Sequence, residues 1–167
     1  GDEAACQLWK PWVRAEGTDK GTLLISERSP GFGDGRQELS FNLRNHPDLF
    51  QPLVLTCAGL GQAARFTGLE NLHLKETDRI DAMAAELRKL GAKVVDGAAF
   101  IEVRPPTAWR AAAVHTYEDH RMAMCLSLAA FNPLASAGSG AGVPVRILDP
   151  RCVGKTFPDY FEALFGV

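Results

Sequence analysis

The sequence has few of the features that mark secreted, membrane or nucleic-acid-binding proteins. Its 167 residues include four cysteines, none in a CxxC pair, so neither a disulfide framework nor a zinc site is indicated. No apolar run reaches the length of a membrane span, no signal peptide opens the chain, and no Lys/Arg-rich run suggests a nucleic-acid surface. We therefore expect a cytoplasmic protein with reduced, mostly buried thiols and with neither a membrane nor nucleic acid as partner.

Metal and dinucleotide sites are not indicated either. His46, His73 and His115 are dispersed and have no metal-ligand spacing. The glycine-rich run 138–142 lacks the GxGxxG spacing and a preceding strand, which a dinucleotide loop needs.

The composition fits one globular domain, or most of one. Hydrophobic residues make up 46% of the chain and the formal net charge is -2. A chain of this length can bury a sizeable core. A helical pattern over 4–12 begins almost at once, with no strand before it, which suggests a piece of a longer protein.

Hydrophobic periodicity predicts alternating helices and strands. Besides the first helix, we expect helices over 48–60, 80–90, 119–131 and 158–165. Strands are expected over 23–25, 39–43, 64–69, 94–95, 100–103, 111–115 and 143–148. Residues 29–36 and 132–142 are predicted loops because they are rich in glycine, proline or small residues.

This pattern indicates an α/β fold built from two copies of one unit. The second helices of the copies begin near Asp48 and Asp119, about 71 residues apart, and repeats of mixed helix and strand share one core. Both helices are almost wholly apolar. Helices that are hydrophobic all round are buried, so we expect these helices inside and the sheets outside.

The most unusual stretch is the charged entrance to the helix over 80–90. Thr77 is a suitable N-cap, and Asp78 and Asp81 suit the positive end of the helix dipole. Arg79 does not suit that end of the dipole, since a cation in the first turn of a helix costs about 0.3–1 kcal/mol. A bound anion would explain it. The alternative is an ordinary solvated, charge-paired helix start.

Charged residues recur at corresponding points of the second copy, which favours the anion site. If the copies stack side by side, their helix entrances meet at one end. The resulting cluster contains four cations with carboxylates and a histidine among them: Lys75, Arg79, Arg121 and Lys155, with Asp48, Glu76, Asp119 and His120. Arginine binds phosphate and carboxylate groups bidentately, and nearby carboxylates can act as general acids or bases.

Three motifs in the same region carry a family resemblance. The first is Asn71 followed by LKETDR at 74–79, the second is YEDHRMAM at 117–124, and the third is LDP at 148–150 with KTFPDYF at 155–161. In this order they resemble the C-terminal domain of the EPSP synthase (3-phosphoshikimate 1-carboxyvinyltransferase) family. The resemblance runs from about Asp48 to the end of the chain.

The resemblance implies a fold and an activity. The family fold has two domains of repeated βαβαββ units, an inverse α/β arrangement, with the substrates between the domains. The family transfers the enolpyruvyl group of phosphoenolpyruvate to the 5-hydroxyl of shikimate 3-phosphate in the shikimate pathway to aromatic amino acids, with no metal or organic cofactor. On this comparison, residues 1–167 are a single, incomplete C-terminal domain whose N-terminal domain is absent, and we expect a monomer.

The resemblance also implies catalytic and phosphoenolpyruvate-binding residues. Asp48 resembles the base that meets the substrate hydroxyl, and Glu76 resembles the proton donor to the enolpyruvyl methylene. Arg79 and Arg121 resemble the pair that holds the phosphoenolpyruvate carboxylate, and Lys155 a further cationic contact. Removal of either arginine is expected to weaken phosphoenolpyruvate binding without harm to folding.

The remaining implied roles concern the second substrate and the packing. Asn71 and Lys75, with Asp48, resemble shikimate 3-phosphate contacts, and His120 is placed to orient Arg121. Tyr117, together with Met122 and Met124, is expected to pack in the core.

Two other functions stay open. One is the related transfer of the enolpyruvyl group to UDP-N-acetylglucosamine, and the other is a non-catalytic anion-binding module. The isolated chain is expected to be inactive because half of the cleft is missing.

Overall fold

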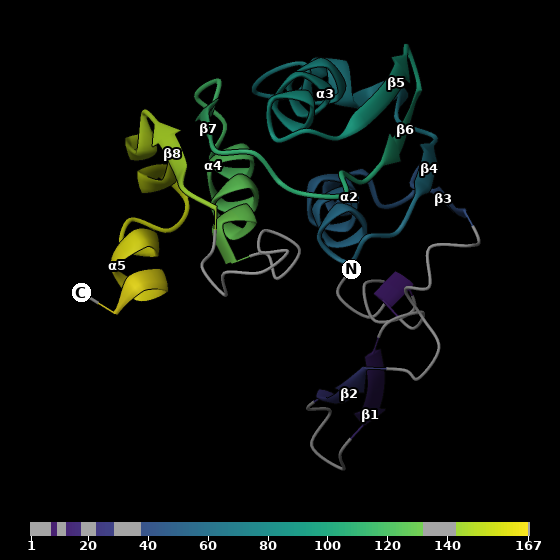
Figure 1. The fold of residues 1–167 in the computed structure, drawn as a ribbon, viewed down its shortest axis with the longest axis horizontal. Coiled ribbons are helices and arrows are strands. Elements are labelled where there is room, and N and C mark those ends of the chain that lie inside the picture. The colour runs from purple at the N-terminus through teal and green to yellow at the C-terminus, as the bar shows by residue number, and fades with distance from the viewer. Residues whose placement is uncertain (1–7, 10–12, 18–22, 29–37, 132–142, 167) are drawn as a thin grey trace.

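The computed structural model describes residues 8–9, 13–17, 23–28, 38–131 and 143–166 (Figure 1). Near the start, β1 (Val13–Gly17) and β2 (Leu23–Arg28) form an antiparallel pair, of which only the second strand was predicted. The helix expected over 4–12 lies outside the described residues except for Leu8 and Trp9, which are helical. The loops expected at 29–36 and 132–142 lie outside them too.

The next six elements form one complete βαβαββ unit. In chain order they are β3 (Leu39–Asn42), α2 (Phe50–Gly59), β4 (Ala64–Thr67), α3 (Arg79–Lys89), β5 (Lys93–Gly97) and β6 (Phe100–Arg104). The strands form one sheet in the order β3-β4-β6-β5, with β3 parallel to β4 and the other neighbours antiparallel. The predicted hairpin of β5 and β6 is confirmed.

The following elements repeat the first four of that unit. They are β7 (Ala112–His115), α4 (His120–Ser127), β8 (Val145–Leu148) and α5 (Tyr160–Phe165), and β7 pairs parallel to β8 as β3 does to β4. Short 3-10 helices join them: η1 (Pro47–Leu49), η2 (Glu70–Leu74), η3 (Leu128–Phe131) and η5 (Pro150–Lys155). The predicted repeat of α/β units is confirmed.

Helices α2 and α4 lie inside and the strands outside them, as their apolar sequences predicted, whereas α5 has no buried residue. Helices α2 and α3 pack against the four-stranded sheet, while α4 packs between α2 and the pair β7–β8 (Figure 1). Phe50, Leu53 and Val54 of α2 are fully buried, as are Met122 and Leu126 of α4. Full burial of one such side chain contributes about 1.5–3 kcal/mol, so this helix layer accounts for much of the core stability.

Helix α2 begins two residues later than its sequence predicted, and Pro52 explains the difference. Asp48 lies in the 3-10 turn η1, and the α-helix starts at Phe50. Pro52 has no N–H with which to bond the carbonyl of Asp48, but in the first turn of a helix that N–H would be unpaired anyway. The α-helix can therefore start only where Pro52 falls in its first turn.

Glycines end the two helices of the first unit in the same way. Gly61 (φ 72°) follows α2 and Gly91 (φ 102°) follows α3. In each case the amides just past the helix bond back to its last carbonyls, as in Gln62 N to Cys57 O at 2.8 Å and Ala92 N to Leu87 O at 3.0 Å. This is the Schellman arrangement, which needs a left-handed residue. The predicted stop at Gly91 is confirmed.

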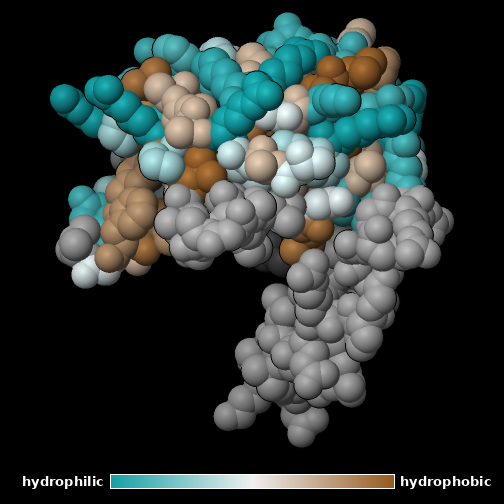
Figure 2. Space-filling view, in the orientation of Figure 1, coloured by the Kyte–Doolittle hydropathy of each residue, from teal (hydrophilic) through white to brown (hydrophobic). Residues whose placement is uncertain are grey.

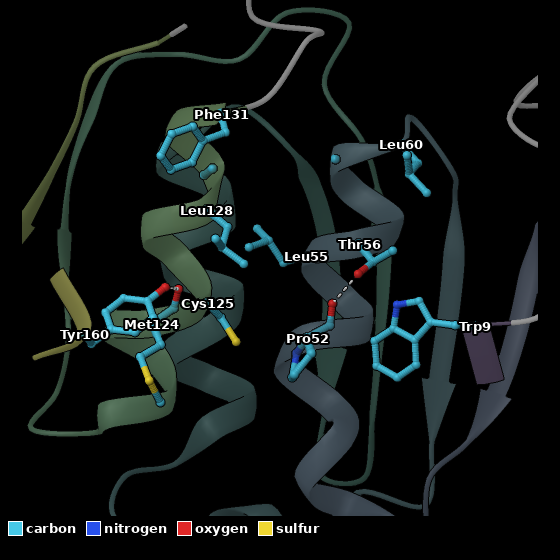
Figure 3. A pocket seen from close by; sticks show the side chains of 12 residues that line it. Trp9, Pro52, Leu55, Thr56, Leu60, Met124, Cys125, Leu128, Phe131 and Tyr160 are labelled. Carbon is cyan, nitrogen blue, oxygen red and sulfur yellow. Dashed lines mark hydrogen bonds between the residues drawn. The ribbon is translucent and has the colours of Figure 1, made fainter. Parts of the chain in front are cut away.

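A mainly apolar cavity lies beside the helices α2 and α4. A cavity of about 590 Å³ lies between α2 and α4, lined mainly by apolar side chains such as Leu55, Met124 and Leu128 (Figure 3). Hydrophilic residues make up much of the upper edge of the molecule in Figure 2, with smaller hydrophobic patches among them. None of the charged residues of the candidate site lines the cavity, so the cavity and the charged cluster are separate features.

Two further expectations can be checked in the described part of the chain. Cys57 and Cys125 are buried free thiols, and Cys152 is a partly buried one, as expected for reduced cysteines. No helix among the residues described has the length and apolar character needed to cross a bilayer.

Candidate active site

The entrance of α3 is organised by an aspartate cap. Asp78, and not the predicted Thr77, is the N-cap: its side chain accepts hydrogen bonds from the amides of Ile80 (3.1 Å) and Asp81 (3.2 Å). A carboxylate is stabilised by the helix dipole as well as by these bonds, which favours Asp78 over the neighbouring hydroxyl. The helix thus begins at Arg79.

The entrance of α4 repeats this device. Asp119 is the N-cap and accepts a hydrogen bond from the amide of Arg121 at 2.8 Å. Unlike Asp78, the Asp119 side chain is fully buried. The two entrances lie side by side, because Asp119 of one contacts Arg79 of the other.

Arg79 is the centre of the cluster. Its three side-chain nitrogens each meet a carboxylate: Nε to Asp119 Oδ2 at 2.8 Å, Nη1 to Asp48 Oδ1 at 3.2 Å and Nη2 to Glu76 Oε2 at 2.9 Å. The side chain is only 2% exposed. The anions that offset this misplaced cation are therefore the protein's own carboxylates. The structure therefore predicts, against the expectation from the sequence, that removal of Arg79 harms folding, because buried Asp119 would lose its partner.

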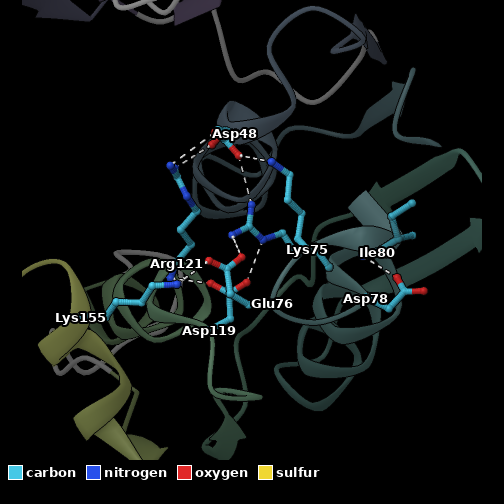
Figure 4. Close-up of polar contacts among 9 residues, drawn as sticks. Asp48, Lys75, Glu76, Asp78, Ile80, Asp119, Arg121 and Lys155 are labelled. Carbon is cyan, nitrogen blue, oxygen red and sulfur yellow. Dashed lines mark hydrogen bonds and ion pairs between the residues drawn. The ribbon is translucent and has the colours of Figure 1, made fainter. Parts of the chain in front are cut away.

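Three further cations surround these carboxylates and are more accessible. Lys75 Nζ lies 3.4 Å from Asp48 Oδ1, Arg121 Nη2 lies 3.6 Å from Asp48 Oδ2, and Lys155 Nζ lies 3.4 Å from Glu76 Oε1 (Figure 4). Their exposed fractions are 33%, 35% and 70%. With Arg79 they make four cations against three carboxylates, so the cluster has one formal positive charge in excess.

The proline of α2 also contributes to this geometry. Because Pro52 cannot donate to the carbonyl of Asp48, that oxygen is available to another donor. Arg121 Nη1 donates to it at 3.2 Å. The backbone oxygen of Asp48 thus accepts a hydrogen bond from Arg121, and the carboxylate of Asp48 attracts the same side chain.

Both carboxylates assigned to chemistry are held in their ionised form. Burial alone would raise the pKa of Asp48, but the charges of Arg121 and Lys75 outweigh it and lower that pKa. The pKa of Glu76 is lowered by its own backbone N–H and by the charges of Arg79 and Lys155. In this arrangement Asp48 can accept a proton, whereas Glu76 can donate one only after its surroundings change.

The side chains of two of the sequence-predicted residues make no hydrogen bond or ion pair with the cluster in the described part of the chain. Asn71 is exposed on η2, and its side chain makes no hydrogen bond or ion pair within the described residues. His120 begins α4 and is 8% exposed, and its Nδ1 has no hydrogen-bond partner among the residues described. The other predicted residues, Asp48, Lys75, Glu76, Arg79, Asp119, Arg121 and Lys155, come together.

The sequence analysis missed the partner of the α3 cap. His73 Nδ1 contacts Asp78 Oδ2, and His73 Nε2 contacts the carbonyl oxygen of Ala98. These contacts join the loop before α3 to the β5–β6 turn. The five-residue separation of His73 and Asp78 was a usable signal, but the position of Ala98 depends on the fold.

Sequence comparison connects this site to one protein family. The family model of EPSP synthase (3-phosphoshikimate 1-carboxyvinyltransferase) matches residues 16–164. The 3-phosphoshikimate 1-carboxyvinyltransferase of Cupriavidus taiwanensis is 42% identical over 159 residues, which cover 93% of this chain and 32% of that protein. The protein of that name from Ralstonia pickettii is 49% identical over 126 residues, covering 74% of this chain and 27% of its own length.

Structure comparison agrees with the sequence comparison at the level of the fold. The EPSP synthase of Acinetobacter baumannii superposes with a TM-score of 0.60 at 24% identity, over 72% of this chain and 27% of that one. The chain spans about a third of the length of the curated relatives that it matches. With a family model that covers most of its residues, the chain belongs to the EPSP synthase (3-phosphoshikimate 1-carboxyvinyltransferase) family.

Proposed function

We propose that the chain is the phosphoenolpyruvate-binding part of a longer enzyme, a 3-phosphoshikimate 1-carboxyvinyltransferase. The enzyme would transfer the enolpyruvyl group of phosphoenolpyruvate to the 5-hydroxyl of shikimate 3-phosphate and release phosphate. The missing N-terminal domain would supply the other half of the cleft. The chain's share of its relatives' length supports this division.

The observation that carries the proposal is the convergence of cations and carboxylates from both repeats. Arg121 and Lys155 come from the second unit, and Lys75 and Arg79 from the first. Phosphoenolpyruvate carries a phosphate and a carboxylate, and fixed cations would hold both and offset charge as phosphate leaves. Arg121 and Lys155, the more exposed pair, are the cations that an incoming substrate would meet first.

Asp48 and Glu76 would carry the proton transfers. As the acceptor hydroxyl adds to C2 of phosphoenolpyruvate, Asp48 would take the hydroxyl proton while Glu76 gives a proton to C3. A bound dianion near Arg79 and Lys155 would compete with Glu76 for those cations and raise its pKa. Substrate binding would thus convert Glu76 from an ion-pair partner into a proton donor.

Arg79 needs an exchange of partners before it can hold a substrate. Its nitrogens already bind three carboxylates, so the phosphoenolpyruvate carboxylate would have to replace Asp48 or Glu76. These two bonds lie on the exposed side of the cluster, whereas the bond to Asp119 is buried. We therefore assign Arg79 a substrate contact through its terminal nitrogens, with Asp119 holding Nε throughout.

The remaining roles concern shikimate 3-phosphate. Asn71 and Lys75, with Asp48, would contact this substrate, and His120 would orient Arg121. The proposal includes no metal or organic cofactor. A single copy of the longer enzyme would suffice for catalysis.

Arg121→Ala in the full-length protein that contains this chain tests the proposal. Loss of charge-assisted hydrogen bonds worth roughly 1.5–3 kcal/mol should weaken phosphoenolpyruvate about ten- to hundredfold. Binding of shikimate 3-phosphate alone should change much less. Steady-state kinetics with each substrate varied would measure both effects, and Arg146→Ala, an exposed arginine of β8, is the matched control.

Other outcomes of the same assay would reject the proposal. Turnover with UDP-N-acetylglucosamine in place of shikimate 3-phosphate would assign the related transferase. Anion binding without turnover on either acceptor would indicate a non-catalytic module. Equal Michaelis constants for Arg121→Ala and Arg146→Ala would remove Arg121 from the site.

A further inference from the structure

The backbone between β7 and α4 has an unfavourable conformation. The amide of Asp119 bonds to the carbonyl of Thr116 at 2.9 Å and closes a four-residue turn. Its two central residues, Tyr117 (φ 54°) and Glu118 (φ 57°), are both left-handed. Turns with positive φ at both central positions normally use glycine, asparagine or aspartate, because other residues pay roughly 1–2 kcal/mol each for this conformation. Something must hold the turn.

One tether is the hydroxyl of Tyr117. It donates a hydrogen bond to Glu86 Oε1 at 2.6 Å, and Glu86 is fully buried in α3, where Lys89 Nζ also pairs with it at 2.7 Å. The side chain of Tyr117 is 37% exposed, so it is not the core residue that its sequence suggested. Burial and the bond to Glu86 raise the pKa of Tyr117 to about 12, which keeps the hydroxyl protonated as a donor.

A second tether joins Thr116 to the residue that follows β8. Thr116 is 2% exposed, and its Oγ1 donates to the carbonyl of Asp149 at 3.2 Å. Asp149 (φ 55°) is the remaining non-glycine residue with positive φ in the described part of the chain. It follows β8 and precedes η5, which ends at Lys155. The segments with left-handed residues that follow β7 and β8 are thus hydrogen-bonded to each other.

The turn leads directly into the charged cluster. Its last residue, Asp119, holds Arg79 Nε at 2.8 Å and caps the amide of Arg121. Glu86 lies two helical turns after Arg79 on the same helix. The Tyr117–Glu86 bond and the Asp119–Arg79 pair therefore fasten this turn to α3 at two points.

We infer that Tyr117, Glu86 and Thr116 are positioning residues that hold the strained turn so that Asp119 meets Arg79 and α4 presents Arg121. None of the three needs to touch substrate. The inference rests on the proposed function only for the identity of the ligand. The geometry of the turn can be measured without substrate.

Tyr117→Phe is the test, with Tyr160→Phe as a matched control. These are the only two tyrosines of the chain, and the hydroxyl of Tyr160 also makes a partly buried contact, to the carbonyl of Met124 at 2.9 Å, away from the turn. In the full-length protein, Tyr117→Phe should speed hydrogen exchange at the Arg121 amide about tenfold, the loss expected for one bond to a charged acceptor. Phosphoenolpyruvate affinity by calorimetry should fall about fivefold. Tyr160→Phe should leave both within about twofold even where it lowers the melting temperature.

A rescue distinguishes positioning from a general loss of stability. Glu118→Gly removes the left-handed penalty at an exposed position, so the double variant Tyr117→Phe/Glu118→Gly should regain most of the Arg121 protection and affinity. If Tyr117→Phe does not fold, Thr116→Val replaces it. This variant removes the second tether and should also speed exchange at the Arg121 amide and weaken phosphoenolpyruvate binding.

The inference is overturned if Arg121 exchange is unchanged in Tyr117→Phe, or if both tyrosine variants lose affinity equally. A wild-type protein that binds no phosphoenolpyruvate would reject the proposed function. Faster Arg121 exchange in Tyr117→Phe would still support the positioning role in that case.

Discussion

The entrances of α3 and α4 begin with the same sequence device and end in different environments. Each has an aspartate N-cap, Asp78 or Asp119, with an arginine in the first turn, Arg79 or Arg121. At α3 the cap is partly exposed and the arginine is buried; at α4 the cap is buried and the arginine is 35% exposed. The buried members of the two pairs, Arg79 and Asp119, bond to each other.

This difference teaches how one motif can supply both structure and accessible charge. A cation near a helix N-terminus is unfavourable unless an anion offsets it. At Arg79 three internal carboxylates do so, and the guanidinium becomes part of the core. At Arg121 the partners are the exposed Asp48 carboxylate and its carbonyl, so the guanidinium stays accessible.

The largest expected difference is in the free energy of unfolding when each arginine side chain is removed separately. Arg79→Ala should lower the free energy of unfolding by about 3–5 kcal/mol, because it leaves Asp119 as an unpaired buried charge. Arg121→Ala should cost less than about 1 kcal/mol, since its ion pair is partly exposed. Urea unfolding of both variants measures the difference; similar losses would mean that burial does not separate the two entrances.

Neutralising the two caps should give a smaller contrast. Asparagine is a good N-cap, so Asp→Asn keeps the capping bond and removes only the charge. Asp119→Asn should cost about 1.5–3 kcal/mol because Arg79 loses a charged partner in the core. Asp78→Asn should cost less than about 1 kcal/mol, since its partner His73 lies near the surface. Thermal melts at neutral pH would show this, and the reverse order would contradict the assigned partners.

The smallest expected effect is a pH dependence confined to the α3 entrance. The hydrogen bond to Asp78, helped by the Ala98 carbonyl, raises the pKa of His73 above its ordinary value of 6.5. The stability from protonated His73 is therefore complete below about pH 6.5 and is lost as the pH rises through the raised folded-state pKa. At the acid end, burial would raise the pKa of Asp78, but its bond to His73 lowers it, so its contribution is lost only as the pH falls through that lowered pKa.

Comparison of wild type with His73→Asn across this range measures the effect. The stability difference should be greatest at mildly acidic pH, stay below about 1 kcal/mol, and shrink toward alkaline pH. In an Asp78→Asn background it should be nearly independent of pH. A difference that grows as the pH rises would have the wrong sign for this pair.

The sequence predicted the architecture because hydrophobic periodicity is local. The apolar helix after Asp48, the alternating strand at Leu39 and the glycine stop at Gly91 depend on nearby residues, and each was found at about its expected place. The convergence of the helix entrances followed from the repeat. These predictions needed no knowledge of which side chains touch.

The sequence predicted which charged residues gather, but not which atoms pair, because most of these contacts join distant parts of the chain. Arg79 was expected to await an external anion, and only the fold brings Asp119, 40 positions away, to its Nε. A local signal did exist for burial, since Arg79 shares a helix face with Met83 and Glu86, all of which are buried. Tyr117 was wrongly predicted to lie in the core. Its backbone is left-handed, so its side chain does not point where a strand or helix pattern would place it.

The three carboxylates around one guanidinium have a consequence for how this region can change in evolution. A substitution at Asp48, Glu76 or Asp119 alters the charge that the same Arg79 must balance, so the effects of these substitutions should not add. Without Arg79, Lys75 and Arg121 still pair with Asp48 and Lys155 with Glu76, but Asp119 loses its ion-pair partner. These four positions are thus one mutational unit: viable variants are expected to change two or more of them together, and a library that varies them one at a time would miss those combinations.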